Sequence, residues 1–198
     1  MSSSGPFTSP DALQAVLVRL MGRQSAALTL VGIDGLGAAG KSTLADALLM
    51  ERPDATVVHG DDFYGPEEGD WRSWTAREGF ERYFDHRRLE SQLLRPLRAG
   101  RVASFQRYDW PSNSLDGWVQ VNPAGVVIVE GVYLLRARLR AYWDLTVFVD
   151  APRELRQQRL HARGESDPGW IERWSAAEDC YERTARPADA ADLVVEGG

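Results

Sequence analysis

The chain has 198 residues, and its 23 lysine and arginine residues against 29 aspartate and glutamate residues give a formal net charge of −6 at pH 7. That length predicts one domain, residues 1–198, with a closed hydrophobic core, and the acidic balance argues against a general nucleic-acid-binding protein. The single cysteine, Cys180, excludes an internal disulfide and a cysteine-based metal site. No apolar run approaches the roughly 20 residues that cross a bilayer. We therefore expect a cytoplasmic protein without a membrane segment.

The N-terminal part of the chain predicts a helix followed by a buried strand. Residues 1–9 are rich in serine, glycine and proline and predict a flexible tail. Apolar residues at helical spacing predict a helix that starts near Pro10 and ends at Gly22. The continuous apolar run 26–33 predicts a central strand buried on both faces, and residues 41–50 predict a helix after a glycine-rich turn.

The rest of the chain alternates between strand and helix patterns. The predicted strands are 56–59, 126–129, 145–149 and 193–195. The predicted helices are two within 76–98, one near 133–142, one from residue 152 and one over 170–184. Residues 60–74 predict a functional loop, and 101–122 predict short extended pieces around a turn at 111–113. This alternation predicts an α/β fold, a parallel sheet with helices on both faces.

The turn after the first strand matches G-x-x-x-x-G-K-[ST], the P-loop motif, at every fixed position. Its backbone amides and the following helix start are suited to a phosphate, Lys41 to the β- and γ-phosphates, and the Ser42 hydroxyl to Mg²⁺. The motif therefore predicts a three-layer P-loop fold that binds a nucleotide. The predicted nucleotide-binding residues here are Gly35, Gly37, Ala38, Ala39, Gly40, Lys41, Ser42 and Thr43.

Other motifs decide which class of P-loop protein this is. The guanine-reading Asn-Lys-x-Asp is absent, although residues 62–65 satisfy the short Asp-x-x-Gly switch pattern. The third strong strand ends in Glu130-Gly131 and lacks the Asp-Glu pair typical of ATPase motors. These observations count against a GTPase switch and an ATPase motor, and a nucleotide-binding switch or regulatory ATPase remains the alternative from a different class.

Several strings together resemble the uridine/cytidine kinase group, which belongs with phosphoribulokinase, pantothenate kinase and nicotinamide riboside kinase. They extend over residues 28–195 and comprise 35–43, 59–64, Phe84-Asp85-His86, Tyr108-Asp109, 129–131 and the arginine-spaced helix after Asp150. The resemblance implies an ATP- and Mg²⁺-dependent kinase that phosphorylates the 5′-hydroxyl of a nucleoside or similar small metabolite. It implies an acceptor-binding region over about 61–122 and a short lid over about 160–170, and it leaves open whether the chain forms a homo-oligomer.

The same resemblance implies the catalytic groups. Asp61 matches the aspartate of Asp-x-Phe-Tyr and is the expected general base, beside Lys41 as the other catalytic residue. Asp62 is the rival, and a plain solvated Asp-Asp turn is the structural alternative. Glu130 matches a partner of Mg²⁺, through water, although a glutamate that ends a strand can instead cap a helix.

The acceptor and lid residues are also carried over. Asp85 matches the residue that hydrogen-bonds the ribose hydroxyls, Tyr108 an aromatic that stacks on the base, and Tyr64 lies in the same acceptor-binding string. The alternatives are a surface helix acid and half-buried core tyrosines.

Arg156, Arg159 and Arg163 share one helical face before the break at 164–169 and resemble lid arginines. We expect Arg159 and Arg163 on ATP and Arg156 on the acceptor, against the alternative of a solvated helix face.

Two patterns favour structural interpretations, and one position departs from the family. The aromatic stripe of Trp170, Trp174 and Tyr181 predicts a core-facing helix more than an adenine site, and the three histidines are too scattered for a metal site.

Asn113 stands where uridine/cytidine kinases have a pyrimidine-reading histidine. The Asp-Pro-Gly-Trp string at 167–170 is closer to nicotinamide riboside kinases. Uridine or cytidine is therefore the first expected acceptor, nicotinamide riboside the second, and pantothenate or a sugar phosphate less favoured.

Overall fold

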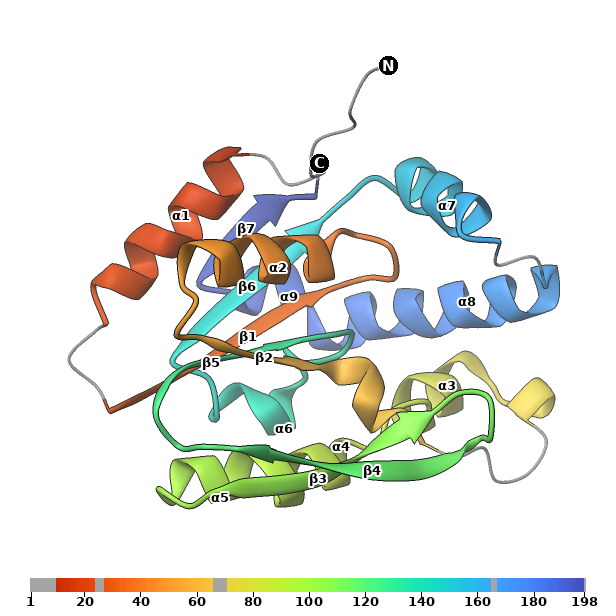
Figure 1. Ribbon diagram of the computed structural model, residues 1–198. Helices are drawn as coiled ribbons and strands as arrows, with labels where there is room; N and C mark the ends of the chain where they lie inside the picture. The colour runs from red at the N-terminus through yellow and green to blue at the C-terminus, as the bar shows by residue number, and fades with distance from the viewer. Residues whose placement is uncertain (1–9, 24–26, 66–70, 165–166, 198) are drawn as a thin grey trace.

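A computed structural model describes residues 10–23, 27–65, 71–164 and 167–197. Its centre is a five-stranded sheet in the order β2-β5-β1-β6-β7, in which every neighbouring pair is parallel (Figure 1). The strands are β1 Leu28–Gly35, β2 Thr56–His59, β5 Gly125–Glu130, β6 Leu145–Asp150 and β7 Leu193–Glu196. The predicted α/β fold with a parallel sheet is confirmed.

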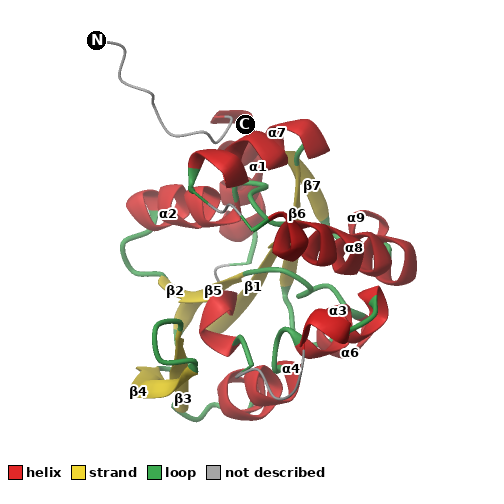
Figure 2. Cartoon of the chain, turned by 90° about the vertical axis from the view of Figure 1, so that its right-hand side faces the viewer, coloured by secondary structure: helices red, strands yellow, loops and turns green. Residues whose placement is uncertain are grey.

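Helices and a hairpin cover the two faces of the sheet, as Figure 2 shows in side view. On one face, α1 (Pro10–Met21) and α2 (Lys41–Glu51) bury apolar side chains against Val31, Ile128 and Val147. The other face packs a second cluster from the helical segment after residue 86, α6 (Ala137–Arg140) and the hairpin β3–β4 (Ala103–Asp109 and Ser114–Val121). Strands covered on both faces explain the continuous apolar runs in the sequence.

A third cluster is mostly aromatic and joins α3 (Ala76–Arg82) to α8 (Pro168–Ala185). Local chemistry defines both helix starts. Thr75 and Glu78 form a capping box on α3, and the Asp167 carboxylate accepts hydrogen bonds from the first amides of α8. The remaining elements are α4 His86–Arg88, the π-helical η3 Leu89–Leu94, α5 Arg95–Arg98, α7 Arg153–Ala162, α9 Pro187–Ala190 and the short 3₁₀ turns η1 Gly60–Phe63 and η2 Trp71–Ser73.

The predicted helix over 133–142 is wrong for its first half, because only α6, Ala137–Arg140, is helical there. Tyr133 has a φ of 64°, in the left-handed region that breaks a right-handed helix. The Leu135 amide is also bound elsewhere, since it donates to the Asp34 carboxylate over 2.7 Å. The predicted tail 1–9 and residues 165–166 of the expected lid lie outside the described residues. None of the described helices has the length and apolar character to cross a membrane.

The carboxyl ends of β2, β5 and β1 lie side by side at one edge of the sheet. The register pairs His59 with Glu130, and Glu130 with Ile33 of β1. Directly after β2 and β5, Gly60 and Gly131 approach so closely that a Cβ on Gly60 would lie 2.9 Å from the Gly131 Cα. Only glycine permits this backbone contact, which brings the segment after His59 against the end of β5.

Candidate active site

The glycine-rich turn between β1 and α2 is built for an anion. Gly40 precedes α2 with a φ of 106°, which glycine adopts without strain. Within the described chain no side chain caps this helix start, so its first amides are open to a ligand. Lys41 is 9% exposed, and its Nζ donates to the Leu36 carbonyl over 2.9 Å, which holds the ammonium over the turn.

A cleft of about 480 Å³ opens at this turn. Six of the predicted nucleotide-binding residues line it, namely Gly37, Ala38, Gly40, Lys41, Ser42 and Thr43. Gly35 and Ala39 are buried parts of the same turn that do not line the cleft. The same cleft is lined by Asp61, Glu130 and a largely aromatic wall of Phe84, Trp110, Trp170 and Trp174. The glycine-rich turn and an aromatic surface therefore share one cavity.

Ser42 and Glu130 come together as expected for a magnesium site. The Ser42 hydroxyl donates to one carboxylate oxygen of Glu130 over 3.2 Å, and His59 Nδ1 lies 2.7 Å from the other. That hydrogen bond raises the pKa of His59. No described group of three or more histidine, cysteine or carboxylate side chains could hold a metal alone. The oxygens of Ser42 and Glu130 nevertheless fit Mg²⁺, which takes few protein ligands and keeps water and substrate phosphate around it.

Asp61 and Asp62 point to different surroundings. The Asp61 side chain lines the cleft. The protein packed around it raises the pKa of its carboxyl, and the negative charge of Glu130 raises that pKa further. The positive charge of Lys41 opposes this rise. Asp62 lies outside the cleft lining, and its carboxylate is 3.7 Å from the Arg107 guanidinium. Of the two rivals for the general base, Asp61 is the one placed beside the phosphate-binding turn.

The predicted acceptor residues lie around the cleft, not on its surface. Tyr64, 1% exposed, packs against Tyr108 and Trp110 with ring centroids 4.9 and 4.5 Å away. The Tyr108 hydroxyl donates to Asn113 over 2.7 Å. The Asp85 carboxylate accepts from the Arg88 amide over 2.9 Å at the start of α4, and it lines a second groove beside this cleft.

The three predicted lid arginines separate into different environments. Arg163 lines the cleft. Arg159 donates to the Ala38 carbonyl of the P-loop over 3.0 Å. Arg156 is held away from the cleft surface, because it donates to the buried Glu178 carboxylate over 2.9 Å and to the Ala151 carbonyl over 3.2 Å.

The aromatic stripe of α8 serves two purposes. Tyr181 is fully buried, as the core interpretation predicts. Trp170 and Trp174 are only partly buried and line the cleft, with their rings 5.6 Å apart. The stripe faces the core at its C-terminal end and the cleft at its N-terminal end, a division that helical spacing does not reveal.

Glu178 is a site residue that the sequence did not single out. Its buried carboxylate accepts from the Gly37 amide of the P-loop, from Trp174 Nε1 over 3.0 Å and from Arg156. One side chain thus joins the P-loop, α7 and α8. The available signal was weak: a glutamate four residues after a tryptophan on the same helix face.

Asp34 is the second such residue, and it is fully buried immediately before the P-loop. Its carboxylate accepts from the amides of Gly35 (2.6 Å) and Leu135 (2.7 Å) and from the Tyr181 hydroxyl. Burial raises its pKa to about 6, against the lowering effect of these hydrogen bonds. The sequence signal for this buried, hydrogen-bonded carboxylate is an aspartate directly after the apolar run 26–33.

Comparisons with known proteins agree with this geometry. Residues 76–198 match the family described as "Phosphoribulokinase / Uridine kinase family". The uridine kinase of Proteus mirabilis (strain HI4320) is 30% identical over 176 residues, which cover 80% of this chain and 78% of that protein. A structure described as a possible uridine kinase from Bacillus stearothermophilus superposes with a TM-score of 0.76 and 26% identity, over 93% of this chain and 97% of that one. A D-glycerate 3-kinase from Cryptococcus neoformans, with a TM-score of 0.54 and 18% identity over 87% of this chain and 86% of that one, shows a shared fold alone.

Loss of the Glu178 carboxylate should destabilise the protein. Glu178→Gln removes the negative charge of the buried ion pair with Arg156. It also places the glutamine NH₂ group against the Arg156 guanidinium, where both groups are hydrogen-bond donors. We expect the free energy of unfolding to fall by about 3 kcal/mol in urea denaturation. Glu182→Gln, an exposed glutamate one turn further along α8, is the matched control and should change stability by less than about 0.5 kcal/mol. Equal losses in the two variants would contradict this assignment.

The stability contribution of Asp34 should fall as the pH rises from about 4 to about 6. Its folded pKa of about 6 exceeds the ordinary 3.8, so in this interval the folded protein keeps a proton that the unfolded chain has released. Linkage places the loss at about 2 kcal/mol between about pH 4 and pH 7. Urea unfolding at both pH values should show this extra loss in the wild type and not in Asp34→Asn. Parallel pH dependences would show that Asp34 does not titrate in this range.

Proposed function

Because the chain belongs to the phosphoribulokinase/uridine kinase family and is a small-molecule kinase, we propose that it transfers the γ-phosphate of ATP to the 5′-hydroxyl of a nucleoside of the uridine or cytidine type. The observation that carries the proposal is the composition of the cleft. Phosphate-binding turn, carboxylate and aromatic rings line the same cavity, as a reaction between a nucleotide and an aromatic acceptor requires.

The P-loop supplies positioning and charge for this reaction. Backbone amides at the start of α2 bind the phosphates of ATP, and Lys41 neutralises charge on the β- and γ-phosphates. Ser42 and Glu130 would hold Mg²⁺, which would offset the negative charge of the phosphates. Arg163 adds a permanent positive charge from the lid side of the cleft, where it stabilises charge on the moving phosphoryl group.

Asp61 activates the acceptor. The acceptor hydroxyl oxygen attacks the γ-phosphorus, the bond from that phosphorus to the β–γ bridging oxygen breaks, the hydroxyl proton passes to the Asp61 carboxylate and ADP leaves. The raised pKa of Asp61 suits this role, because a base closer in pKa to the working pH accepts a proton more readily.

The aromatic wall supports an acceptor with a flat ring. Trp110, Trp170, Trp174 and Phe84 present surfaces on which a base can stack. Tyr64 and Tyr108 back this wall. Asp85, the residue after Phe84, supplies the carboxylate proposed for the ribose hydroxyls. Asn113 is already bonded to Tyr108, which leaves stacking as the main recognition of the base and keeps nicotinamide riboside as the second candidate acceptor.

The acceptor class is tested by ADP release with a panel of uridine, cytidine, nicotinamide riboside, pantothenate and a sugar phosphate. We expect ADP release to depend on a nucleoside and a 5′-monophosphate to appear by mass spectrometry. Reaction with pantothenate or a sugar phosphate alone would replace the nucleoside proposal. Acceptor-independent ADP release without a phosphorylated product would favour a regulatory ATPase instead.

Asp61→Asn should lower kcat at least about 100-fold, the usual contribution of a general base, and change the affinity for ATP less than about threefold. Asp62→Asn is the matched control, because its carboxylate faces Arg107 outside the cleft. Steady-state kinetics and nucleotide binding measure both quantities. An active Asp61→Asn beside an inactive Asp62→Asn would assign the base to Asp62.

A further inference from the structure

A second groove, of about 920 Å³, lies beside the active-site cleft and shares Phe84 with it. The charged side chains that line it comprise four arginines, Arg82, Arg87, Arg136 and Arg138, and two acids, Glu81 and Asp85. In a chain with a net charge of −6, this groove therefore gathers an excess of positive charge. The proposed kinase reaction uses none of these four arginines.

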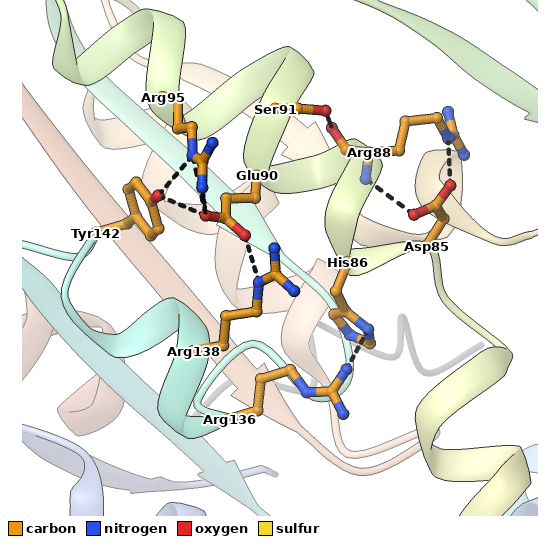
Figure 3. A network of polar contacts seen from close by, with 9 residues as sticks. All are labelled: Asp85, His86, Arg88, Glu90, Ser91, Arg95, Arg136, Arg138 and Tyr142. Atoms are coloured by element: carbon orange, nitrogen blue, oxygen red, sulfur yellow. Dashed lines mark hydrogen bonds and ion pairs between the residues drawn. The ribbon is translucent and has the colours of Figure 1, made fainter.

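The positive charge is incompletely neutralised by the surrounding carboxylates. Glu90 is shared, because its two oxygens accept from Arg138 and from Arg95, the latter over 2.6 Å (Figure 3). Arg136 donates to Glu81 over 2.7 Å. Arg87 is exposed and has no ion pair among the residues that the structure describes. The groove thus keeps donors that a negatively charged ligand can use.

His86 identifies a specific unsatisfied donor in this groove. The side chain is buried and lines the groove, and Arg136 Nη1 lies 2.5 Å from its Nδ1 (Figure 3). A guanidinium can only donate, so Nδ1 must accept, and a neutral imidazole then carries its hydrogen on Nε2. Burial, with the Arg136 charge, lowers the pKa of His86 well below its usual value and keeps the ring neutral. Nε2 is buried and makes no hydrogen bond among the described residues.

A buried N–H without an acceptor is unfavourable, and protein structures rarely keep one. An oxygen of a bound anion would satisfy it, while Arg136 on the other ring nitrogen fixes the orientation of the imidazole. Arg87, in the residue after His86, adds a second guanidinium at the mouth of the groove. We propose that this groove is a binding site for a compact oxyanion, the phosphate group of a small metabolite or free phosphate, held by His86, Arg136 and Arg87.

The groove also lies against the segment that carries Asp61. The Asp85 amide, one residue before His86, donates to the Phe63 carbonyl over 2.8 Å. Arg88 donates to the Asp62 carbonyl over 2.9 Å. A ligand on His86 therefore sits at the start of α4, which is hydrogen-bonded to the segment after β2.

The test measures phosphate binding and not turnover, so its result is independent of the proposed acceptor. The P-loop is first saturated with Mg²⁺ and a non-hydrolysable ATP analogue, and inorganic phosphate is then titrated by calorimetry and by ¹H–¹⁵N spectra of the His86 imidazole. We expect saturable binding and a shift of the His86 Nε2–H signal. The absence of either response would overturn the proposal.

Variants locate the site. Arg136→Gln should raise the dissociation constant for phosphate at least tenfold, and Arg87→Gln, which removes an exposed side chain and spares the fold, at least threefold. Arg52→Gln removes an arginine with a similar ion pair at the end of α2, outside both cavities, and should leave binding unchanged. Equal weakening in Arg52→Gln, or wild-type binding in Arg87→Gln and Arg136→Gln, would overturn the assignment. A parallel titration with glycerol 3-phosphate separates the two sources: tighter binding of the ester indicates a metabolite, and tighter binding of inorganic phosphate indicates the free ion.

Discussion

The Asp34 carboxylate joins the three pieces of chain from which the active site is made. It is fully buried at the end of β1, where it accepts hydrogen bonds from the first amide of the P-loop, from Leu135 after β5 and from Tyr181 of α8. A buried carboxylate is tolerated only when its oxygens are fully bonded, so the three partners must keep these positions together. The P-loop, the segment after Glu130 and the cleft-facing helix are thereby held in one arrangement.

Helix α8 extends that arrangement from the core to the cleft. Tyr181 is bonded to Asp34, Glu178 one turn earlier accepts from the P-loop amide of Gly37, and Trp174 a further turn earlier lines the cleft while donating to Glu178. Successive turns of one helix thus contact the core, the phosphate-binding turn and the aromatic wall. A shift of α8 would alter the phosphate side and the acceptor side of the cleft together, and Arg156 on Glu178 connects α7 to the same movement.

The elements that could be predicted are those whose signals are local. Each sheet strand contains a run of apolar residues. The P-loop is a contiguous motif between a strand and a helix, so its conformation follows from neighbours in the sequence. The helix expected over 133–142 failed because its competing interactions are distant: the Leu135 amide is bonded to Asp34, 101 residues away. Trp170 and Trp174 were assigned to the core because helical spacing shows that a stripe is apolar and not whether it faces a core or a cavity.

The sequence by itself determined the parallel α/β architecture, the phosphate-binding turn and the acidic and hydroxyl groups available at the strand ends, because these depend on hydrophobic periodicity and short motifs. Only the tertiary structure decided that Asp61 faces the cleft while Asp62 faces Arg107, that Glu178 contacts the P-loop, and that Asp85 and His86 lie along a second, basic groove. The physical reason is that a side chain's role depends on its charge partners and its burial. Both are set by residues that folding brings together from distant parts of the chain.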